Sequence, residues 1–411
     1  MNGLKRDQSQ VINQLLTLFP VVLIVGARQV GKTTLAKICR PDWRYFDLER
    51  GSDFDFITND FDFFFREYPA HLIIDEAQES PQLFRELRGV IDADRTQKNR
   101  FILTGSSSPE MLSGIADSLA GRVAIVELGT CKRNEIAGEP LSEFYQIFTK
   151  PIDANDLQVL KHLSKSSGDL LSAVLRGGYP EPVLTDHPDA FFAWMDNYFK
   201  TYIASDVRRL FPRLDMVKYR RFISMLASLS GTIINKAQLG RAIDVSEVTI
   251  RDYLDIAHQT LIWRNIPSYA GTAARAVVKM PKGILRDAGL LNYLGNITTR
   301  EQLVRSPLVG QIFESFVIEE ILKGMHASNI AKWDYSYYRT RNGAEIDLIL
   351  EGSFGLVPIE IKFGTSTRLK QLTALTRFVQ EQQLPFGIVI NQSSEVRMLS
   401  DHIIQIPASA L

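Results

Sequence analysis

The chain has 411 residues, of which 45% are hydrophobic and 23% charged, and its 47 basic side chains are balanced by 47 acidic ones. This composition is that of an ordinary globular protein of about two to four domains, and it excludes an overall charge that would attract nucleic acid or a membrane surface. Two cysteines, Cys39 and Cys131, are too few for a disulfide framework, and neither a signal-peptide core nor a membrane-spanning apolar run is found, so we expect a soluble cytoplasmic protein.

The first predicted elements are a helix over residues 4–18 and an apolar strand over residues 21–25, which leads into a loop of the form G-x-x-x-x-G-K-[ST]. Gly26 and Gly31 permit backbone conformations in which successive N–H groups point at phosphate oxygens. Lys32 supplies a charge, Thr33 supplies a hydroxyl for Mg²⁺, and the helix that follows presents the positive end of its dipole. The predicted phosphate-binding residues are Gly26, Ala27, Arg28, Gln29, Val30, Gly31, Lys32, Thr33 and Thr34.

A short strand over residues 43–48 and an apolar strand over residues 71–76 come next, and the second of them ends in Asp75 and Glu76. In doubly wound sheets the carboxyl ends of the strands carry the functional side chains. We therefore expect Asp75 to hold Mg²⁺, often through water, and Glu76 to act as the general base that polarises the attacking water. The alternative is that these acids cap the helix predicted near residues 81–90.

A further strand over residues 100–106 ends in small polar side chains, of which Thr104 and Ser106 are candidates for sensing the terminal phosphate. Serine and threonine are also ordinary turn residues, which is the alternative for both positions. Arg122 follows a glycine, and it could stabilise charge on the transferred phosphate in its own chain or in a neighbouring subunit. The alternative for Arg122 is an exposed surface arginine.

Four segments, in this order, carry a resemblance: G26-A-R-Q-V-G-K-T-T34, L72-I-I-D-E-A-Q78, I102-L-T-G-S-S107 and S118-L-A-G-R122. They resemble the AAA-type P-loop ATPases of bacteria and archaea that carry a C-terminal domain of unknown function with a restriction-endonuclease-like fold. The resemblance implies an ATPase core at residues 1–132 that uses ATP and Mg²⁺. It defines the nucleotide-dependent part of the protein better than its cellular task.

Residues 133–225 have apolar positions at helical spacing and look like the lid-like helical region that follows an AAA core. Several basic side chains of this region are candidates for nucleic-acid contact, although a charge run on a helix is more often a solvated face. These side chains are Arg208, Arg209, Arg213, Lys218, Arg220 and Arg221.

The pattern over residues 226–298 predicts a winged-helix module. Helices are predicted at residues 236–243 and 247–257, separated by a turn, and strand-like segments at residues 261–266 and 276–280 would form the wing. The second helix carries Glu247, Asp252 and Asp255 against a single Arg251, so its exposed face would repel phosphates. We therefore favour domain packing or protein binding over DNA binding for this module.

After this module, the segment of residues 281–294 carries Lys282, Arg286 and Asp287, and the resemblance implies that it joins the module to the last domain. Residues 299–411 begin with an amphipathic helix predicted at residues 309–322. Strands are then predicted at residues 335–339, 344–350 and 356–362, followed by a helix near residues 369–380 and a strand at residues 386–390.

The alternation of the third of these strands places Glu360 and Lys362 on one face, and Asp347 lies on the strand before it. Asp, Glu and Lys that converge on one sheet face are typical of restriction-endonuclease-like cores, in which the acids bind Mg²⁺ and the lysine activates water. Glu314 on the preceding helix could add a further ligand. The alternative is a cross-strand ion pair, which occurs in many sheets.

The predicted fold class is therefore α/β: a P-loop NTPase sheet of AAA type with a helical lid, a winged-helix module and a C-terminal nuclease-like α/β domain. The predicted activity is Mg²⁺-dependent ATP hydrolysis. Two hypotheses remain open for the task of the protein. It either acts on DNA through the C-terminal domain, or it is a nucleotide-state switch that binds a protein partner and has a catalytically silent C-terminal domain. A homo-oligomer is compatible with both hypotheses.

Overall fold

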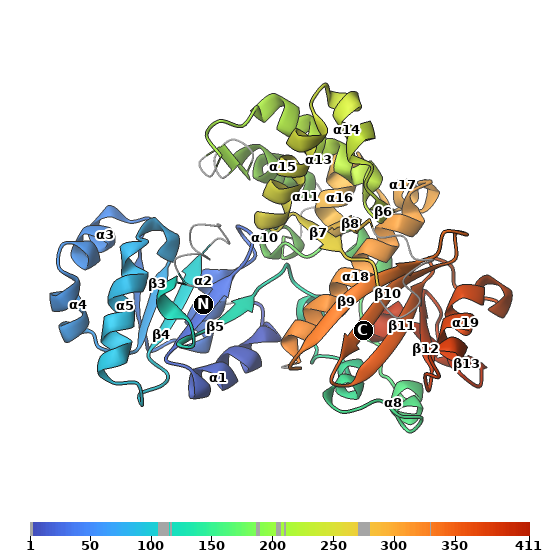
Figure 1. Ribbon diagram of the computed structural model, residues 1–411, viewed down its shortest axis with the longest axis horizontal. Helices are drawn as coiled ribbons and strands as arrows, with labels where there is room; N and C mark the ends of the chain where they lie inside the picture. The colour runs from blue at the N-terminus through green and yellow to red at the C-terminus, as the bar shows by residue number, and fades with distance from the viewer. Residues whose placement is uncertain are drawn as a thin grey trace. The chain divides into compact units, whose positions relative to one another are not determined.

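The computed structural model describes residues 3–105, 115, 117–185, 190–202, 207–208, 211–269, 280–328 and 330–411. The chain divides into two compact units (Figure 1). Unit 1 comprises residues 1–131 and 259–261, and unit 2 comprises residues 132–258 and 262–411. Both units combine helices with sheets, so the predicted mixed α/β class is confirmed.

Unit 1 is built on a five-stranded parallel sheet with the strand order β2-β3-β4-β1-β5. The strands are β1 (Val21–Val25), β2 (Arg44–Asp47), β3 (Leu72–Asp75), β4 (Phe101–Gly105) and β5 (Val123–Glu127). The helices are α1 (Gln8–Leu18), α2 (Lys32–Cys39), α3 (Gly51–Thr58), α4 (Phe61–Glu67) and α5 (Gln82–Ala93), with a 3₁₀ turn η1 (Ala77–Glu79). Strands β1, β3 and β4 are buried throughout, which explains why their sequences are almost continuously apolar.

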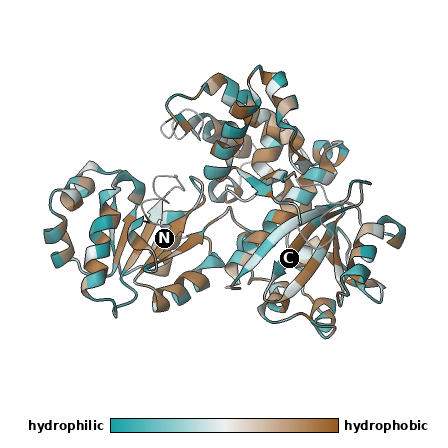
Figure 2. Ribbon diagram, in the orientation of Figure 1, coloured by the Kyte–Doolittle hydropathy of each residue, from teal (hydrophilic) through white to brown (hydrophobic). Residues whose placement is uncertain are grey.

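Helices cover both faces of this sheet. Alternate residues of β1, such as Leu23, belong to a buried cluster with Phe64 of α4 and Leu87 of α5, while α1 and α2 pack against the sheet on its other face. Figure 2 shows the apolar strands between helices whose outer surfaces are hydrophilic. Because all strands are parallel, their carboxyl ends meet at one edge, and the loop that follows β1 lies at that edge.

The first part of unit 2 is mainly helical. Its helices are α7 (Arg133–Ala137), η2 (Glu143–Thr149), α8 (Asp156–Lys161), α9 (Leu170–Arg176), α10 (Pro180–Val183), α11 (Ala190–Thr201), α13 (Met216–Leu229), α14 (Lys236–Ile243), α15 (Glu247–Gln259), α16 (Ala288–Leu294) and α17 (Arg300–Arg305). Strands β6 (Thr232–Ile233), β7 (Trp263–Ile266) and β8 (Lys282–Leu285) form an antiparallel sheet with the order β6-β8-β7.

Helices α14 and α15 have the helix-turn-helix spacing expected from the sequence. Strand β8, in contrast, lies at other residues than the strand predicted for the wing. The strand predicted over residues 276–280 lies outside the described residues except for Met280, and β8 is instead part of the segment predicted to join two domains. Lys282, the first residue of β8, is thereby part of a sheet, where it pairs with Ile233 and Ile266. The assignment of this module as a winged helix stays a prediction.

The C-terminal part of unit 2 contains a six-stranded mixed sheet with the order β13-β14-β12-β11-β10-β9. Its strands are β9 (Trp333–Arg339), β10 (Glu345–Gly352), β11 (Gly355–Ile361), β12 (Gly387–Asn391), β13 (Arg397–Ser400) and β14 (Ile403–Pro407), and its helices are α18 (Val309–Ala327), η4 (Leu369–Gln371), α19 (Thr373–Glu381) and η5 (Ala408–Ala410). Neighbours β11, β12 and β14 run parallel, and the other pairs are antiparallel.

Helix α18 is not the amphipathic helix predicted from the sequence, because residues on all its sides are buried. Its acids are compensated within unit 2: Glu319 is 2.5 Å from Arg264 Nε, and Glu320 is 2.7 Å from Lys323 Nζ. Buried charges of this kind require such partners. In the part of the chain that is described, none of the helices combines the length and the apolar character needed to cross a membrane.

Candidate functional site

The loop between β1 and α2 requires glycine at two positions. Gly31 adopts φ = 94°, a left-handed conformation that side chains disfavour. At Gly26 a Cβ atom would lie 2.5 Å from the carbonyl oxygen of Leu128, so a larger residue would force the loop away from the chain after β5. The two glycines thus allow the tight curvature of the loop and bring it to the first turn of α2.

Lys32 is folded back over this loop. Its side chain is buried, and Nζ donates hydrogen bonds to the carbonyl oxygens of Gly26 and Ala27, both at 3.1 Å. The ammonium group therefore lies inside the loop rather than in solvent. A phosphate group at this place would meet a positive charge and the N-terminal end of α2 together.

The other predicted phosphate-binding residues contribute in different ways. Arg28 forms an ion pair with Glu49 at 2.9 Å, so its side chain is directed to the loop after β2. Val30 is buried, and Thr34 faces Gly3, because a Cβ atom on Gly3 would lie 2.8 Å from Thr34 Cγ2. Gln29 is exposed at φ = 62°. At these positions a phosphate group would meet the backbone of the loop and not the side chains.

The carboxylate of Asp75 accepts hydrogen bonds from the hydroxyl groups of three residues. Thr33 Oγ1 and Tyr45 Oη donate to Oδ2 at 2.7 and 2.8 Å, and Thr104 Oγ1 donates to Oδ1. Asp75 and Thr104 are buried. The structure thus brings Asp75, Thr33 and Thr104 together at the carboxyl edge of the sheet. Tyr45 was not among the residues selected from the sequence.

Glu76 has a strained backbone, with φ = 51° and ψ = 48°. A left-handed conformation costs a residue other than glycine about 1–3 kcal/mol, and such strain often occurs at functional sites. The N–H of Glu76 donates to Thr104 Oγ1 at 3.3 Å, and Gln78 Nε2 donates to Glu76 Oε2 at 2.6 Å. Thr104 therefore links the two acids, and Gln78 orients the carboxylate of Glu76.

This donor set fits Mg²⁺ and a nucleoside triphosphate. Magnesium prefers oxygen ligands, and the hydroxyl of Thr33 and the carboxylate of Asp75 are already in contact beside the loop. The ammonium of Lys32 and the glycine-dependent curvature of the loop suit the phosphates. Thr33 and Asp75 would hold the metal ion, which would neutralise charge on the phosphate oxygens.

Arg122 is not brought to this site within its own unit. It precedes Val123, which pairs with Val21 at the start of β1, whereas the loop follows the end of β1. Arg122 therefore lies at the amino edge of the parallel sheet, where its guanidinium binds the carboxylate of Asp92 at 2.8 and 2.9 Å. This ion pair lowers the pKa of Asp92 through hydrogen bonding. Ser106 lies outside the described residues.

A second set of charged residues lies in unit 2, where the sequence predicted a metal site. The ammonium of Lys282 is in contact with Glu314 Oε1 and lies 3.0 Å from Glu345 Oε1 and 3.8 Å from Asp347 Oδ1. Lys282 is almost completely buried. Burial lowers the pKa of Lys282, but its carboxylate neighbours outweigh this effect and raise it. A permanent cation thus stands between the acids of α18 and β10.

The remaining predicted ligands have protein partners as well. Asp347 Oδ2 accepts from the N–H of Ile361 at 2.7 Å, and Glu360 Oε1 is 2.5 Å from Lys362 Nζ. Burial raises the pKa of Glu314 and of Glu360, while the ammonium groups of Lys282 and Lys362 beside them oppose this shift and favour the charged carboxylates. Within the described ranges, no group of three or more His, Cys, Asp or Glu side chains is arranged to hold a metal ion.

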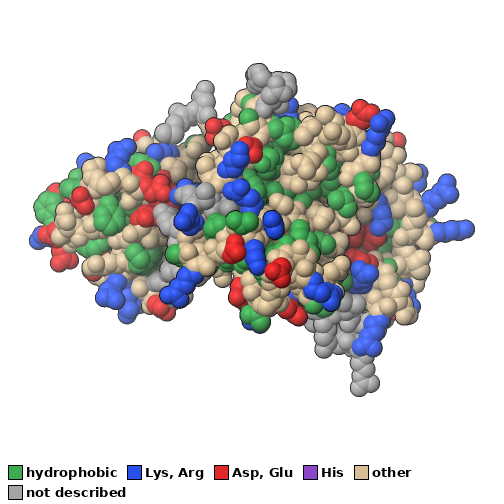
Figure 3. All heavy atoms as spheres, turned by 90° about the horizontal axis from the view of Figure 1, so that it is seen from above, with side chains coloured by type: hydrophobic (Ala, Val, Ile, Leu, Met, Phe, Trp, Pro, Cys, Tyr) green, Lys and Arg blue, Asp and Glu red, His purple; other side chains and the backbone are tan. Residues whose placement is uncertain are grey.

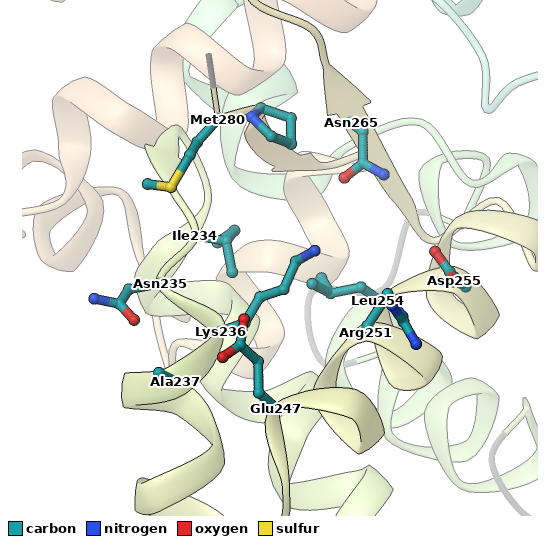
Figure 4. Close-up of a pocket in the computed structure, with 11 residues that line it drawn as sticks. Ile234, Asn235, Lys236, Ala237, Glu247, Arg251, Leu254, Asp255, Asn265 and Met280 are labelled. Carbon is teal, nitrogen blue, oxygen red and sulfur yellow. The ribbon is translucent and has the colours of Figure 1, made fainter. Parts of the chain in front are cut away.

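The helix-turn-helix region contains a pocket of about 280 Å³ between α14, α15 and β7 (Figure 4). Apolar side chains, among them Ile234 and Leu254, form part of its wall, and the charged residues around it are Lys236, Glu247, Arg251 and Asp255. These charges cancel, so the pocket lacks the basic character that DNA binding requires. On the face shown in Figure 3, basic and acidic side chains are likewise interspersed.

Five residues of the predicted basic cluster lie in the described part of the chain. Arg208, Arg213, Arg220 and Arg221 are exposed, Lys218 Nζ donates to the carbonyl oxygen of Asp244, and Arg209 lies outside the described residues.

Comparison with protein families assigns a class to unit 1. Residues 18–137 match an AAA domain, which places this unit among the P-loop ATPases, as its motifs predict. Residues 167–301 and 309–411 match two domains of unknown function, DUF8612 and DUF4143.

Two mycobacterial proteins are similar to the chain over nearly its whole length. The chain is 31% identical over 99% of its length to the uncharacterized protein Rv2008c of Mycobacterium tuberculosis and to the uncharacterized protein Mb2031c of Mycobacterium bovis, and the match covers 84% of each. The chain belongs to the family of these mycobacterial proteins.

Two solved structures are similar to parts of the chain at low identity. The Walker-type ATPase PABY2304 of Pyrococcus abyssi is 14% identical, with a TM-score of 0.42, over 70% of this chain and 95% of that protein. The RuvB Holliday junction branch migration motor of Thermotoga maritima is 16% identical, with a TM-score of 0.28, over 63% and 89%. The assignment of unit 1 rests on the AAA-domain match and on the geometry of its loop.

Proposed function

We propose that unit 1 binds ATP with Mg²⁺ and hydrolyses it. The observation that carries this proposal is the hydrogen bond of 2.7 Å between Thr33 Oγ1 and Asp75 Oδ2. It joins the phosphate loop to the acidic end of β3, two motifs that P-loop NTPases use around one metal ion. The AAA-domain match over residues 18–137 supports the same function.

In this proposal each side chain has a separate task. Lys32 and the loop N–H groups bind the phosphates, while Thr33 and Asp75 hold Mg²⁺, which supplies positive charge to the transferred phosphoryl group. Glu76 takes the proton of the attacking water as general base, and Gln78 orients its carboxylate. Thr104 connects the carboxylate of Asp75 with the backbone N–H of Glu76 and so fixes the position of the two acids relative to each other.

The role of Glu76 is tested by the substitution Glu76→Gln, which keeps the shape of the side chain and removes its basicity. We expect kcat for ATP to fall by about 10²- to 10⁴-fold, the range of general-base catalysis, with nucleotide affinity retained. Turnover is measured by phosphate release and affinity by titration with ATP. Glu67→Gln, an exposed change at the end of α4, is the matched control. Unchanged turnover in Glu76→Gln would refute the assignment of the base.

For unit 2 we infer that the protein is a nucleotide-state switch whose C-terminal domain does not cleave DNA. The position of Lys282 favours this function over the DNA-acting alternative, because its ammonium already neutralises Glu314 and Asp347. A metal ion at these acids would have to displace a buried charge. The charges around the α14–α15 pocket are balanced, and its acidic side chains would repel the phosphates of DNA. They therefore favour a protein partner over DNA.

This inference is tested with the wild type and the Asp347→Ala and Lys362→Ala variants. Each protein is incubated with single- and double-stranded DNA in Mg²⁺ or Mn²⁺, and ATP turnover is recorded with and without the same DNA. We expect neither cleavage nor a rise in turnover. Metal-dependent cleavage by the wild type that is lost in both variants, or a clear stimulation of turnover by DNA, would establish the alternative.

A further inference from the structure

Tyr45 is the one hydroxyl at Asp75 that no sequence motif includes. It lies on β2 in register with Ile73 of β3, two residues before the end of that strand. From there its hydroxyl reaches across to Asp75 Oδ2 at 2.8 Å. The residue is half-buried, and the hydrogen bond to Asp75 makes its hydroxyl part of the site.

The ring of Tyr45 is held in place by a second contact. Lys37 of α2 places its Nζ 3.3 Å from the centre of the ring, an attractive cation–π arrangement. A phenol with an ordinary pKa of about 10 is protonated at neutral pH, so the hydroxyl acts as the donor to Asp75. The orientation of this hydroxyl is thus set by α2 and β2 together.

The next residue of β2 anchors the strand independently. Phe46 points to the opposite face of the sheet, where its ring lies 5.1 Å from that of Phe64 and 5.6 Å from that of Tyr68. Loss of the Tyr45 hydroxyl would leave this aromatic cluster intact. The hydroxyl is therefore not needed for the packing of the strand, and it donates a hydrogen bond to Asp75.

The three donors to Asp75 fall into two kinds. Thr33 belongs to the phosphate loop, and it is the residue whose hydroxyl would also serve Mg²⁺. Tyr45 and Thr104 belong to β2 and β4, the strands on either side of β3, and they reach the two different oxygens of the carboxylate. Side chains of both neighbouring strands thus donate hydrogen bonds to the carboxylate of Asp75, and neither bond involves the phosphate loop.

We propose that Tyr45 is a positioning residue of the nucleotide site: its hydroxyl holds the carboxylate of Asp75 in the orientation in which Asp75 serves Mg²⁺. This role rests on the proposed ATPase function. Hydrogen bonds from outer partners orient metal-binding carboxylates, and their loss typically weakens metal binding about 10- to 100-fold. Loss of the Tyr45 hydroxyl is therefore expected to change how nucleotide binding depends on the Mg²⁺ concentration. It should not change the affinity for the nucleotide in the absence of Mg²⁺.

The test compares the wild type with Tyr45→Phe in the full-length chain, because this change removes one oxygen and keeps the ring. Binding of a fluorescent ADP analogue is measured in EDTA and then over a titration of free Mg²⁺. We expect equal affinities in EDTA and a rise of about 10-fold or more in the Mg²⁺ concentration that gives half of the metal-dependent gain. At saturating Mg²⁺ the turnover of the variant should approach that of the wild type.

Tyr68→Phe is the matched control, since it makes the same chemical change in the aromatic cluster on the other face of the sheet and should leave the Mg²⁺ dependence unchanged. An unaltered Mg²⁺ titration in Tyr45→Phe, or an equal loss of affinity with and without the metal ion, would overturn the role of Tyr45. A wild type whose nucleotide binding does not respond to Mg²⁺ at all would overturn the proposed function, and this role with it.

Discussion

We expect the Lys32→Ala protein to lose ATP binding and turnover together, by about 10²- to 10³-fold in kcat/KM, the usual cost of removing one preorganised charge or donor at a reacting group. The reason is local: Lys32 is the buried cation inside the phosphate loop, where its Nζ lies 3.1 Å from two loop carbonyls. Phosphate release and titration with a fluorescent nucleotide measure the two effects.

The control for this experiment is Lys98→Ala. Lys98 is exposed in the loop before β4, at the other edge of the sheet, where it donates to the carbonyl oxygen of Arg95. Its removal should alter neither binding nor turnover. If Lys32→Ala bound nucleotide as tightly as Lys98→Ala, the loop would not be the phosphate site.

The second large effect is expected on stability, from Lys282→Met. Removing one partner of a buried ion pair typically costs about 3–5 kcal/mol, because the charge left behind has lost its compensation. Here the ammonium that is removed is in contact with Glu314 and lies 3.0 Å from Glu345. Urea unfolding followed by tryptophan fluorescence measures this effect selectively, since Trp194, Trp263 and Trp333 lie in unit 2 and Trp43 alone in unit 1.

A double-mutant comparison separates the ion pair from packing. Glu314→Gln in the Lys282→Met background removes the uncompensated carboxylate, so it should recover part of the lost stability. Lys161→Met, an exposed change at the end of α8, should stay within about 0.5 kcal/mol of the wild type. A Lys282→Met protein as stable as this control would show that the ammonium does not neutralise the acids around it.

The elements around the phosphate loop could be predicted because their signals are local. The five apolar residues of β1, the glycines at 26 and 31 and the acidic end of β3 each show their role within a few positions. Chain order then brings them to one edge of a parallel sheet, whose geometry leaves little choice. The parallel sheet and the P-loop class predicted in this way are confirmed, while the roles of the single residues remain proposals.

The residues that sequence reasoning missed act over long separations. Tyr45 lies 30 positions before Asp75, and its one signal was a strand that ends beside the acidic strand of the site. Lys282 lies 63 positions before Glu345 in a segment that reads as a connector, because the strand β8 is only four residues long. A polar residue in a short strand looks like a surface residue until its neighbours in space are known.

For Arg122 the sequence left two interpretations open: a residue that acts on phosphate, in its own chain or in a neighbouring subunit, and an exposed surface arginine. The glycine before it and the order of the motifs suggested a residue that acts on phosphate, but those signals do not say at which edge of the sheet the residue lies. The register of β5 with β1 answers this: Arg122 precedes the start of the strand, and Asp92 binds its guanidinium there. Direct action in its own unit is therefore excluded by the direction of one strand.

The folded-back position of Lys32 has a consequence for the release of products. Because the carbonyl oxygens of Gly26 and Ala27 already accept hydrogen bonds from its ammonium, an arriving phosphate exchanges partners with the loop and gains only the difference between the two sets of bonds. When the nucleotide leaves, the ammonium of Lys32 would again donate to these carbonyl oxygens. Its buried charge would therefore keep hydrogen-bond partners after the ligand has gone. In the proposed ATPase function, the loop itself would therefore compensate the charge of the ammonium between one nucleotide and the next.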